Sequence, residues 1–214
     1  MRTNFSCLGA PWRTSAGAVY LACCAQAVAH VPYFEESDLS AAQPFMIRDV
    51  EQSKAIYAYL ESAEDQDPYL LVVSEPVQIY VKVIIPYCAS YADFRPSFAL
   101  IGPGLPAPDA ELPFNVPQGH GVIVRHDLPA GATRPSMYEF FSDQFYFEGP
   151  VLDIDVTETG NYRVIYWQPE GDGGDYVAIV GRREDFRPED WERSFTNTRE
   201  IRKRTYIHGP CVEP

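Results

Sequence analysis

The sequence predicts an all-β fold, an antiparallel, jelly-roll-like β-sandwich followed by a short C-terminal helical extension. Short runs of alternating apolar and polar residues, separated by Gly, Asp and Pro turn signals, favour strands. The composition agrees, with 14 Tyr, 12 Phe and 19 Pro. The 214 residues suffice for one such domain with extensions, since all-β domains reach roughly 200–250 residues without splitting. We expect the sandwich at residues 30–181.

The clearest strand pattern occupies residues 151–181. Leu152, Ile154 and Val156 alternate with aspartates, and two glycine-rich turns lead into further apolar runs at 162–167 and 176–180. We interpret this stretch as a β-meander, in which consecutive strands pair. Earlier strands are expected at 43–47, 55–60, 69–73, 77–85, 98–101, 121–125 and 144–147.

Residues 1–29 are interpreted as a secretory signal. A run of small and apolar residues at 16–29 ends in Ala-x-Ala patterns and is shorter than the about 20 residues of a membrane span. Secretion or export to the periplasm is therefore expected. Tyr-Leu-Ala-Cys at 20–23 also resembles a bacterial lipobox, so a lipid anchor at Cys23 is the alternative.

The charge balance is strongly acidic. The net charge is −13, and removal of residues 1–29 takes away 2 of the 17 basic residues and none of the 30 acidic ones, leaving −15. Because such a surface repels phosphate, a nucleic-acid partner is not expected.

Two of the five cysteines lie beyond the signal, Cys88 and Cys211. In an oxidising compartment an isolated pair is most simply one disulfide. Two free thiols are the alternative.

One resemblance covers roughly residues 50–181. The chain is similar there to the bacterial pre-peptidase C-terminal domains, small jelly-roll sandwiches appended to secreted enzymes. The resemblance implies a non-catalytic accessory or binding role and transfers no catalytic residue. Two departures are the lack of a protease domain before the sandwich and the long loop at 102–117. The matching segments are Asp65–Tyr69, Val77–Ile85, Ser97–Ile101, Gly160–Val164 and Gly174–Ala178.

Catalytic motifs are missing from the sequence beyond residue 29. It contains no phosphate-binding loop, nucleophile elbow, His-Glu-x-x-His or Cys-x-x-Cys pattern. A carbohydrate-binding module is a further alternative, because exposed Tyr and Trp side chains can stack on sugars, although aromatics in a sandwich also form its core.

Copper binding is the sharpest chemical hypothesis. Cleavage after Ala29 would make His30 the N-terminal residue, whose amine and imidazole suit Cu(II) together with His120 or His126. This set resembles the histidine brace of secreted copper proteins. Cleavage after Ala27 would remove it.

Calcium is the other cofactor hypothesis, because acidic residues crowd two turns and Ca²⁺ takes oxygen ligands. The first turn carries Glu170, Asp172 and Asp175. Asp and Gly also serve tight turns for conformational reasons. The second turn carries Glu64, Asp65 and Asp67.

The extension at 182–214 differs from the rest of the chain, since it carries 8 of the 15 basic residues beyond the signal. Pro188 and two following acids predict a helix start, and Trp191 and Phe195 then share a face. One interpretation is docking to an anionic membrane surface or an acidic protein. The other is that the extension lies on the sandwich's own acidic surface. The predicted docking residues are Trp191, Arg199, Arg202, Lys203 and Arg204.

Overall fold

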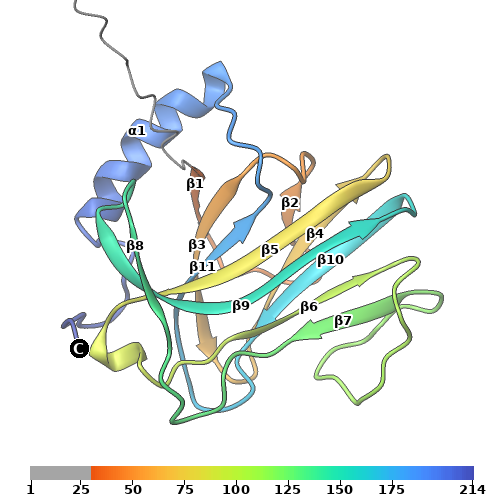
Figure 1. Cartoon of the computed structure of the whole chain (residues 1–214), viewed down its shortest axis with the longest axis horizontal. Helices are drawn as coiled ribbons and strands as arrows, with labels where there is room; N and C mark the ends of the chain where they lie inside the picture. Colours follow the sequence, from red (N-terminus) through yellow and green to blue (C-terminus); the bar gives the residue numbers. More distant parts are fainter. Residues whose placement is uncertain (1–29) are drawn as a thin grey trace, which may run out of the picture.

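A computed structural model describes residues 30–214, so the predicted signal and Cys23 lie outside the described residues. Two β-sheets pack face to face, and one helix lies on the outer side of one of them (Figure 1). The predicted all-β sandwich with a C-terminal helix is confirmed. The elements are β1 (Val31–Phe34), β2 (Phe45–Ile47), β3 (Lys54–Ser62), β4 (Gln66–Val73), β5 (Val77–Pro86), η1 (Ala89–Tyr91), β6 (Ser97–Gly102), β7 (Gly121–Arg125), β8 (Ser136–Glu139), β9 (Gln144–Val156), β10 (Gly160–Trp167), β11 (Asp172–Val180) and α1 (Pro188–Arg202).

The strand order is β1-β3-β11-β5-β9-β8 in the six-stranded sheet and β2-β4-β10-β6-β7 in the five-stranded sheet. Both sheets are mixed rather than purely antiparallel, because β1 pairs with β3 and β2 pairs with β4 in parallel. Each of these short edge strands is separated from its partner by other segments of chain. Only a tight hairpin forces an antiparallel pair, so these two strands are free to run parallel.

The predicted β-meander is wrong. Strands β9 and β11 belong to the six-stranded sheet, whereas β10 lies between β4 and β6 in the other. The two turns therefore carry the chain from one sheet to the other. Alternation in a sequence identifies the buried face of a strand but not its neighbour, and sheets about 10 Å apart are within reach of a short turn.

The core fills the space between the sheets, and further apolar clusters cover both outer faces. On β3, Ile56 and Leu60 point inward and Tyr57 points outward. Tyr57 packs in an outer cluster with Ile201 of α1. On the other sheet, the long loop folds back and Phe114 packs edge-on against Trp167, with ring centroids 5.2 Å apart.

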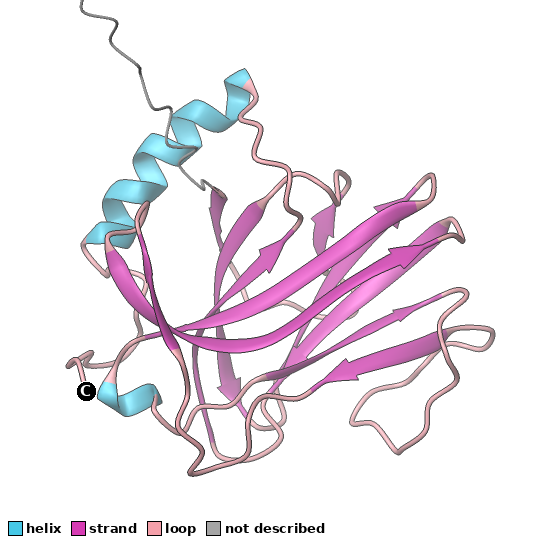
Figure 2. Ribbon diagram, in the orientation of Figure 1, coloured by secondary structure: helices cyan, strands magenta, loops and turns pink. Residues whose placement is uncertain are grey.

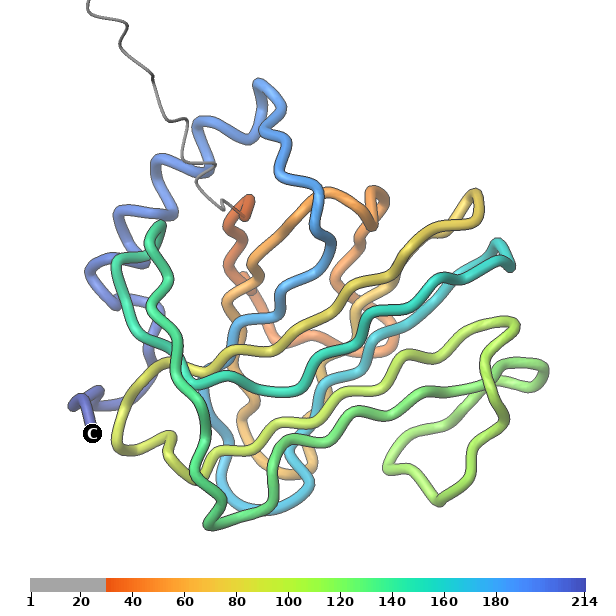
Figure 3. Tube along the Cα trace, in the orientation of Figure 1, coloured from red at the N-terminus to blue at the C-terminus, as the bar shows by residue number. Residues whose placement is uncertain are grey.

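The C-terminal extension crosses the outer side of the six-stranded sheet and ends beside the loop after β5 (Figures 2 and 3). Cys88 and Cys211 are joined there by a disulfide, with Cα atoms 4.9 Å apart. The Ala89 N–H donates to the Val212 carbonyl at 2.7 Å. The described part of the chain contains no helix long and apolar enough to cross a membrane.

Candidate functional site

Helix α1 lies beside β1 and the β8–β9 hairpin (Figure 1). Its first turn is held by the buried Asp190, whose Oδ2 accepts hydrogen bonds from Gln52 Nε2 at 2.8 Å and from the Arg187 N–H at 3.0 Å. Further along, Asn197 Nδ2 donates to the carbonyl of Pro32 at 3.0 Å. Polar contacts therefore provide much of the attachment of the helix to the sandwich.

The two faces of α1 are reversed relative to an ordinary surface helix. Its buried residues are Asp190, Ser194 and Ile201, of which only Ile201 is apolar. Trp191 and Phe195 are 53% and 74% exposed, and their rings lie 6.2 Å apart. Because a surface helix normally turns its apolar stripe to the core, this exposed aromatic stripe is available to a partner.

The aromatic stripe borders a groove of about 680 Å³. Phe186, which precedes α1, lies 5.5 Å from Trp191 between ring centroids. Across the groove, the carbonyl of Phe141 in the β8–β9 turn accepts a hydrogen bond from Arg202 Nε at 3.0 Å. The lining is mostly aromatic and basic: Phe141, Phe186, Trp191, Ser194, Phe195, Thr198, Arg199, Arg202 and Lys203.

The first arginines of the extension face acidic residues of the sandwich. Arg182 Nη2 lies 2.7 Å from Asp153 Oδ2, and Arg183 Nη2 lies 2.8 Å from Asp49 Oδ2. Arg187 pairs with the same Asp49 carboxylate. The predicted alternative, in which the extension lies on the sandwich's acidic surface, thus describes this first part.

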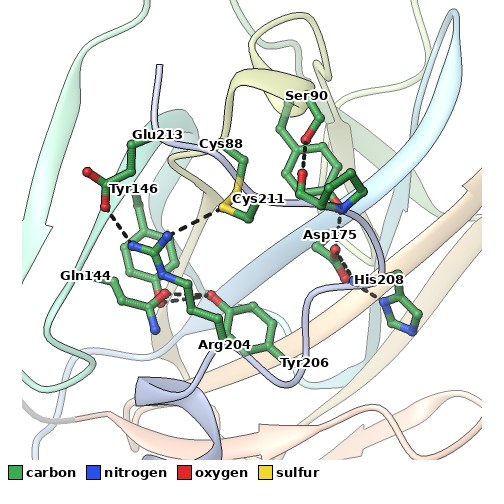
Figure 4. The surroundings of a disulfide bond; sticks show 12 residues. Cys88, Ser90, Gln144, Tyr146, Asp175, Arg204, Tyr206, His208, Cys211 and Glu213 are labelled. Atoms are coloured by element: carbon green, nitrogen blue, oxygen red, sulfur yellow. Dashed lines mark hydrogen bonds and ion pairs between the residues drawn. A yellow bond between two sulfur atoms is a disulfide. The ribbon is translucent and has the colours of Figure 1, made fainter.

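The later basic residues behave differently. Within residues 30–214, Arg199 and Arg202 form no ion pair, and Lys203 pairs with Glu200, its neighbour on the helix, at 3.1 Å. Trp191, Arg199, Arg202 and Lys203 therefore gather at one groove. Arg204 does not join them, because its Nη2 lies 2.9 Å from Glu213 Oε1 and its Nη1 contacts the disulfide sulfur of Cys211 (Figure 4).

A second concave region lies between the loop after β1 and residues 205–208, with a volume of about 460 Å³. Tyr59 and His208 stack within it, with ring centroids 4.2 Å apart, so the imidazole covers one face of the tyrosine ring. The pocket is acidic, and its carboxylates are Glu35, Glu36, Asp38, Glu61 and Glu200.

Three carboxylates converge beside this pocket, and two of them line it. Glu35, Asp38 and Asp67 each offer an oxygen, and these oxygens lie within 4.8 Å of one another. Burial raises the pKa of Glu35 to about 7, and Asp38 adds to the shift. Burial and the neighbouring Glu35 raise the pKa of Asp67 to about 8, although Tyr176 Oη donates to its Oδ2 at 2.6 Å. Like charges are thus crowded in a poorly solvated place.

The turn residues Glu170, Asp172 and Asp175 are not gathered into a comparable group within residues 30–214. Asp175 is buried at the C-terminal segment instead (Figure 4). Its Oδ2 accepts hydrogen bonds from Tyr91 Oη and from the His208 N–H, the latter at 2.9 Å. Of the second acidic turn, Asp65 accepts a hydrogen bond from the Glu61 N–H at 2.7 Å, and only Asp67 belongs to the cluster.

The structure does not bring His30 together with His120 or His126. His30 precedes β1 in the six-stranded sheet, whereas the other two flank β7 in the five-stranded sheet, far from β1 in Figure 1. Burial lowers the pKa of His30, and its Nδ1 lies 2.5 Å from Ser53 Oγ. His126 Nδ1 lies 3.1 Å from Ser97 Oγ.

The chain matches no family model, and the comparison with curated proteins found no match. The resemblance to pre-peptidase C-terminal domains therefore stays a prediction.

Two strands that position the candidate site residues, β1 and β8, were not predicted from the sequence. The sequence predicts no strand before residue 43, although Val31–Phe34 forms β1 and is followed by Glu35 and Asp38, which lie near Asp67. The strand β8 was also missed, and with it the turn that carries Phe141 to α1. A signal for the first was available, because Val-Pro-Tyr-Phe is rich in strand formers.

Proposed function

We propose that this chain is a secreted or periplasmic, non-catalytic binding module that docks a protein segment on the outer face of α1. The reversed orientation of α1 carries the proposal, because the helix directs Trp191 and Phe195 to solvent and Asp190 and Ser194 to the sandwich. Exposing two large aromatic side chains brings the isolated chain no stability, whereas burying them against a partner gains hydrophobic free energy.

The chemistry of the groove defines the partner segment. Its aromatic walls fit apolar anchor side chains, and the Arg199, Arg202 and Lys203 end fits Asp or Glu. Guanidinium groups that lack a carboxylate partner in their own chain suit bidentate carboxylate recognition. The bound segment is therefore an apolar stretch flanked by acidic residues.

A protein segment fits better than an anionic membrane. Lipid recognition by charge typically uses clusters of about four to eight basic residues, and only three line this groove. The chain as a whole carries a net charge of −13 and is repelled by an anionic bilayer. A groove with two opposed walls also matches a peptide more closely than a flat surface.

The proposed compartment rests on two features. The 1–29 segment has the composition of a secretory signal, and the Cys88–Cys211 disulfide suits an oxidising environment. An accessory role agrees with the resemblance to the pre-peptidase C-terminal domains.

Selection of a random peptide library against the immobilised chain tests this function. We expect enriched peptides that combine aromatic or aliphatic anchors with Asp or Glu. Substituting Trp191→Ser with Phe195→Ser should weaken the best peptide about 100-fold, and Arg199→Glu with Arg202→Glu about 10–100-fold. Arg163→Glu is the matched charge control on an exposed position of β10 and should leave binding unchanged.

Four results would overturn the proposal. Enriched peptides without acidic residues, or peptides that bind both groove variants normally, would exclude this surface. Binding to phosphatidylserine-rich vesicles that is lost in the groove variants, without any peptide binding, would assign the face to a membrane. A dimer in sedimentation experiments that disappears in the Trp191→Ser, Phe195→Ser variant would assign it to a second copy of the chain.

A further inference from the structure

We propose that Glu35, Asp38 and Asp67 form a calcium site that fastens the loop after β1 to the start of β4. The three carboxylates come from segments about thirty positions apart in the sequence, yet they offer oxygens within 4.8 Å of one another. Two ligands of one Ca²⁺ ion, each at 2.3–2.6 Å from it, are at most about 5 Å apart, so this spacing suits a shared ion.

The burial of Asp67 is a second observation, independent of the spacing, that indicates a bound cation. Its side chain is 0% exposed, and its Oδ1 has no hydrogen-bond partner among the described residues. Its other oxygen accepts a hydrogen bond from Tyr176 Oη at 2.6 Å, which fixes the orientation of the carboxylate. A buried carboxylate oxygen without a partner costs free energy, and a bound cation would remove that cost.

No basic side chain neutralises the cluster. Within residues 30–214, none of the three carboxylates forms an ion pair. The charged neighbours that most affect Glu35 are Asp38 and Asp65, and both raise its pKa. Elsewhere in the molecule, the buried Asp127 is neutralised by Arg134 Nη2 at 2.6 Å. Glu35, Asp38 and Asp67 have no such partner in the described part of the chain.

The ligand chemistry favours Ca²⁺ over other ions. All three donors are carboxylates, whereas Zn²⁺ and Cu²⁺ prefer imidazole or thiolate. Mg²⁺ demands near-ideal octahedral geometry and keeps several waters, which a fully buried ligand such as Asp67 hinders. Ca²⁺ is larger and tolerates irregular coordination, so it accepts carboxylates that are buried to different extents. Water and loop carbonyl oxygens would complete its coordination shell.

The three carboxylates differ in solvent exposure, and this difference indicates from which side an ion would enter. Asp38 is exposed, Glu35 is partly buried and Asp67 is buried, and Glu35 and Asp38 both line the acidic pocket. We therefore place the entry of the ion on the pocket side, at Asp38 and Glu35. A general-acid role is excluded for the Asp67 carboxyl group by its burial, because no substrate could reach it.

Thermal unfolding of the full, disulfide-bonded chain with EGTA, millimolar CaCl₂ or millimolar MgCl₂ tests the site. At 10–100 times the Kd, we expect Ca²⁺ to raise Tm by about 3–10 °C, with little effect of Mg²⁺. Asp67→Asn and Glu35→Gln should each abolish the Ca²⁺ response. Asp67→Asn preserves the acceptor for Tyr176, and Glu35→Gln lies nearer the surface, so at least one variant should fold.

Asp172→Asn is the matched control, an acid-to-amide change in the other acidic turn, and it should retain the full response. The site would be refuted by a wild-type Tm that Ca²⁺ leaves unchanged. It would equally be refuted by a response that survives in Asp67→Asn or Glu35→Gln, or that disappears in Asp172→Asn. The groove peptide should bind with the same affinity in EGTA, so the calcium site and the docking face can fail separately.

Discussion

The two halves of the C-terminal extension carry four basic residues each but have different surroundings. In the first half, Arg183 and Arg187 pair with Asp49, and the Asp190 carboxylate accepts a hydrogen bond from Gln52, so these charges have partners on the sandwich. In the second half, Arg199 and Arg202 lie beside exposed aromatic rings without an ion pair in the described chain. A basic run therefore indicates function only where the fold leaves it unpartnered.

The largest expected effect is on the anchoring of the extension as a whole. Replacing Cys88 and Cys211 with Ser removes a link between residues 123 positions apart. In the chain-entropy model, such a loop closure is worth about 4–5 kcal/mol, so denaturant unfolding should show a loss of that order. A loss below about 1 kcal/mol would mean that the extension is held by its other contacts alone.

Asp175→Asn should have the next largest effect. The carboxylate accepts hydrogen bonds from Tyr91 and from the His208 N–H, and its burial makes any lost bond costly. We expect about 2–3 kcal/mol of destabilisation in urea unfolding. Asp172→Asn, three residues earlier at the exposed start of β11, should stay within about 0.5 kcal/mol. Equal effects of the two substitutions would contradict the expected difference between the buried Asp175 and the exposed Asp172.

The stability of the sandwich beneath the first half of the extension should depend on pH through Lys54 of β3. This buried side chain donates to the carbonyls of Asp49 and Gln52, and burial lowers its pKa to about 8, below its ordinary 10.5. Between these values the unfolded chain binds more protons, so the stability contributed by Lys54 rises with pH. The difference in unfolding free energy between wild type and Lys54→Met should grow by about 1–2 kcal/mol from pH 7 to pH 10. A constant difference would contradict the lowered pKa.

The smallest effect on stability is expected in the open half. Because Trp191 and Phe195 are largely exposed and their ring neighbours are each other and Phe186, their joint replacement by Ser should change the free energy of unfolding by no more than about 0.5 kcal/mol. A loss above about 1.5 kcal/mol in urea unfolding would show that the stripe supports the fold rather than a partner.

Local sequence signals predicted the local features of this molecule. The start of α1 at Pro188 and the shared face of Trp191 and Phe195 follow from residues three or four positions apart, and both are observed. Which face α1 buries depends on the polar groups offered by Gln52 and Pro32, more than a hundred residues away. No periodicity in the helix carries that information.

The acidic cluster was only partly predictable for the same reason. Asp67 was predicted within an acidic turn, but the other acids of that turn, Glu64 and Asp65, do not belong to the cluster. Glu35 and Asp38 reach Asp67 because β1 pairs in parallel with β3, a long-range choice that leaves no local pattern. The β-meander was predicted incorrectly for the same reason, because strand pairing leaves no local pattern. Turns that cross between sheets look like hairpin turns in a sequence.

Amide hydrogen exchange of the chain with and without its best selected peptide tests the docking face most directly. The docking proposal predicts slower exchange at residues 186–203 and in the β8–β9 turn, and no change around the acidic pocket at residues 35–38 and 57–61. Protection confined to the acidic pocket, with α1 exchanging as in the free chain, would contradict it.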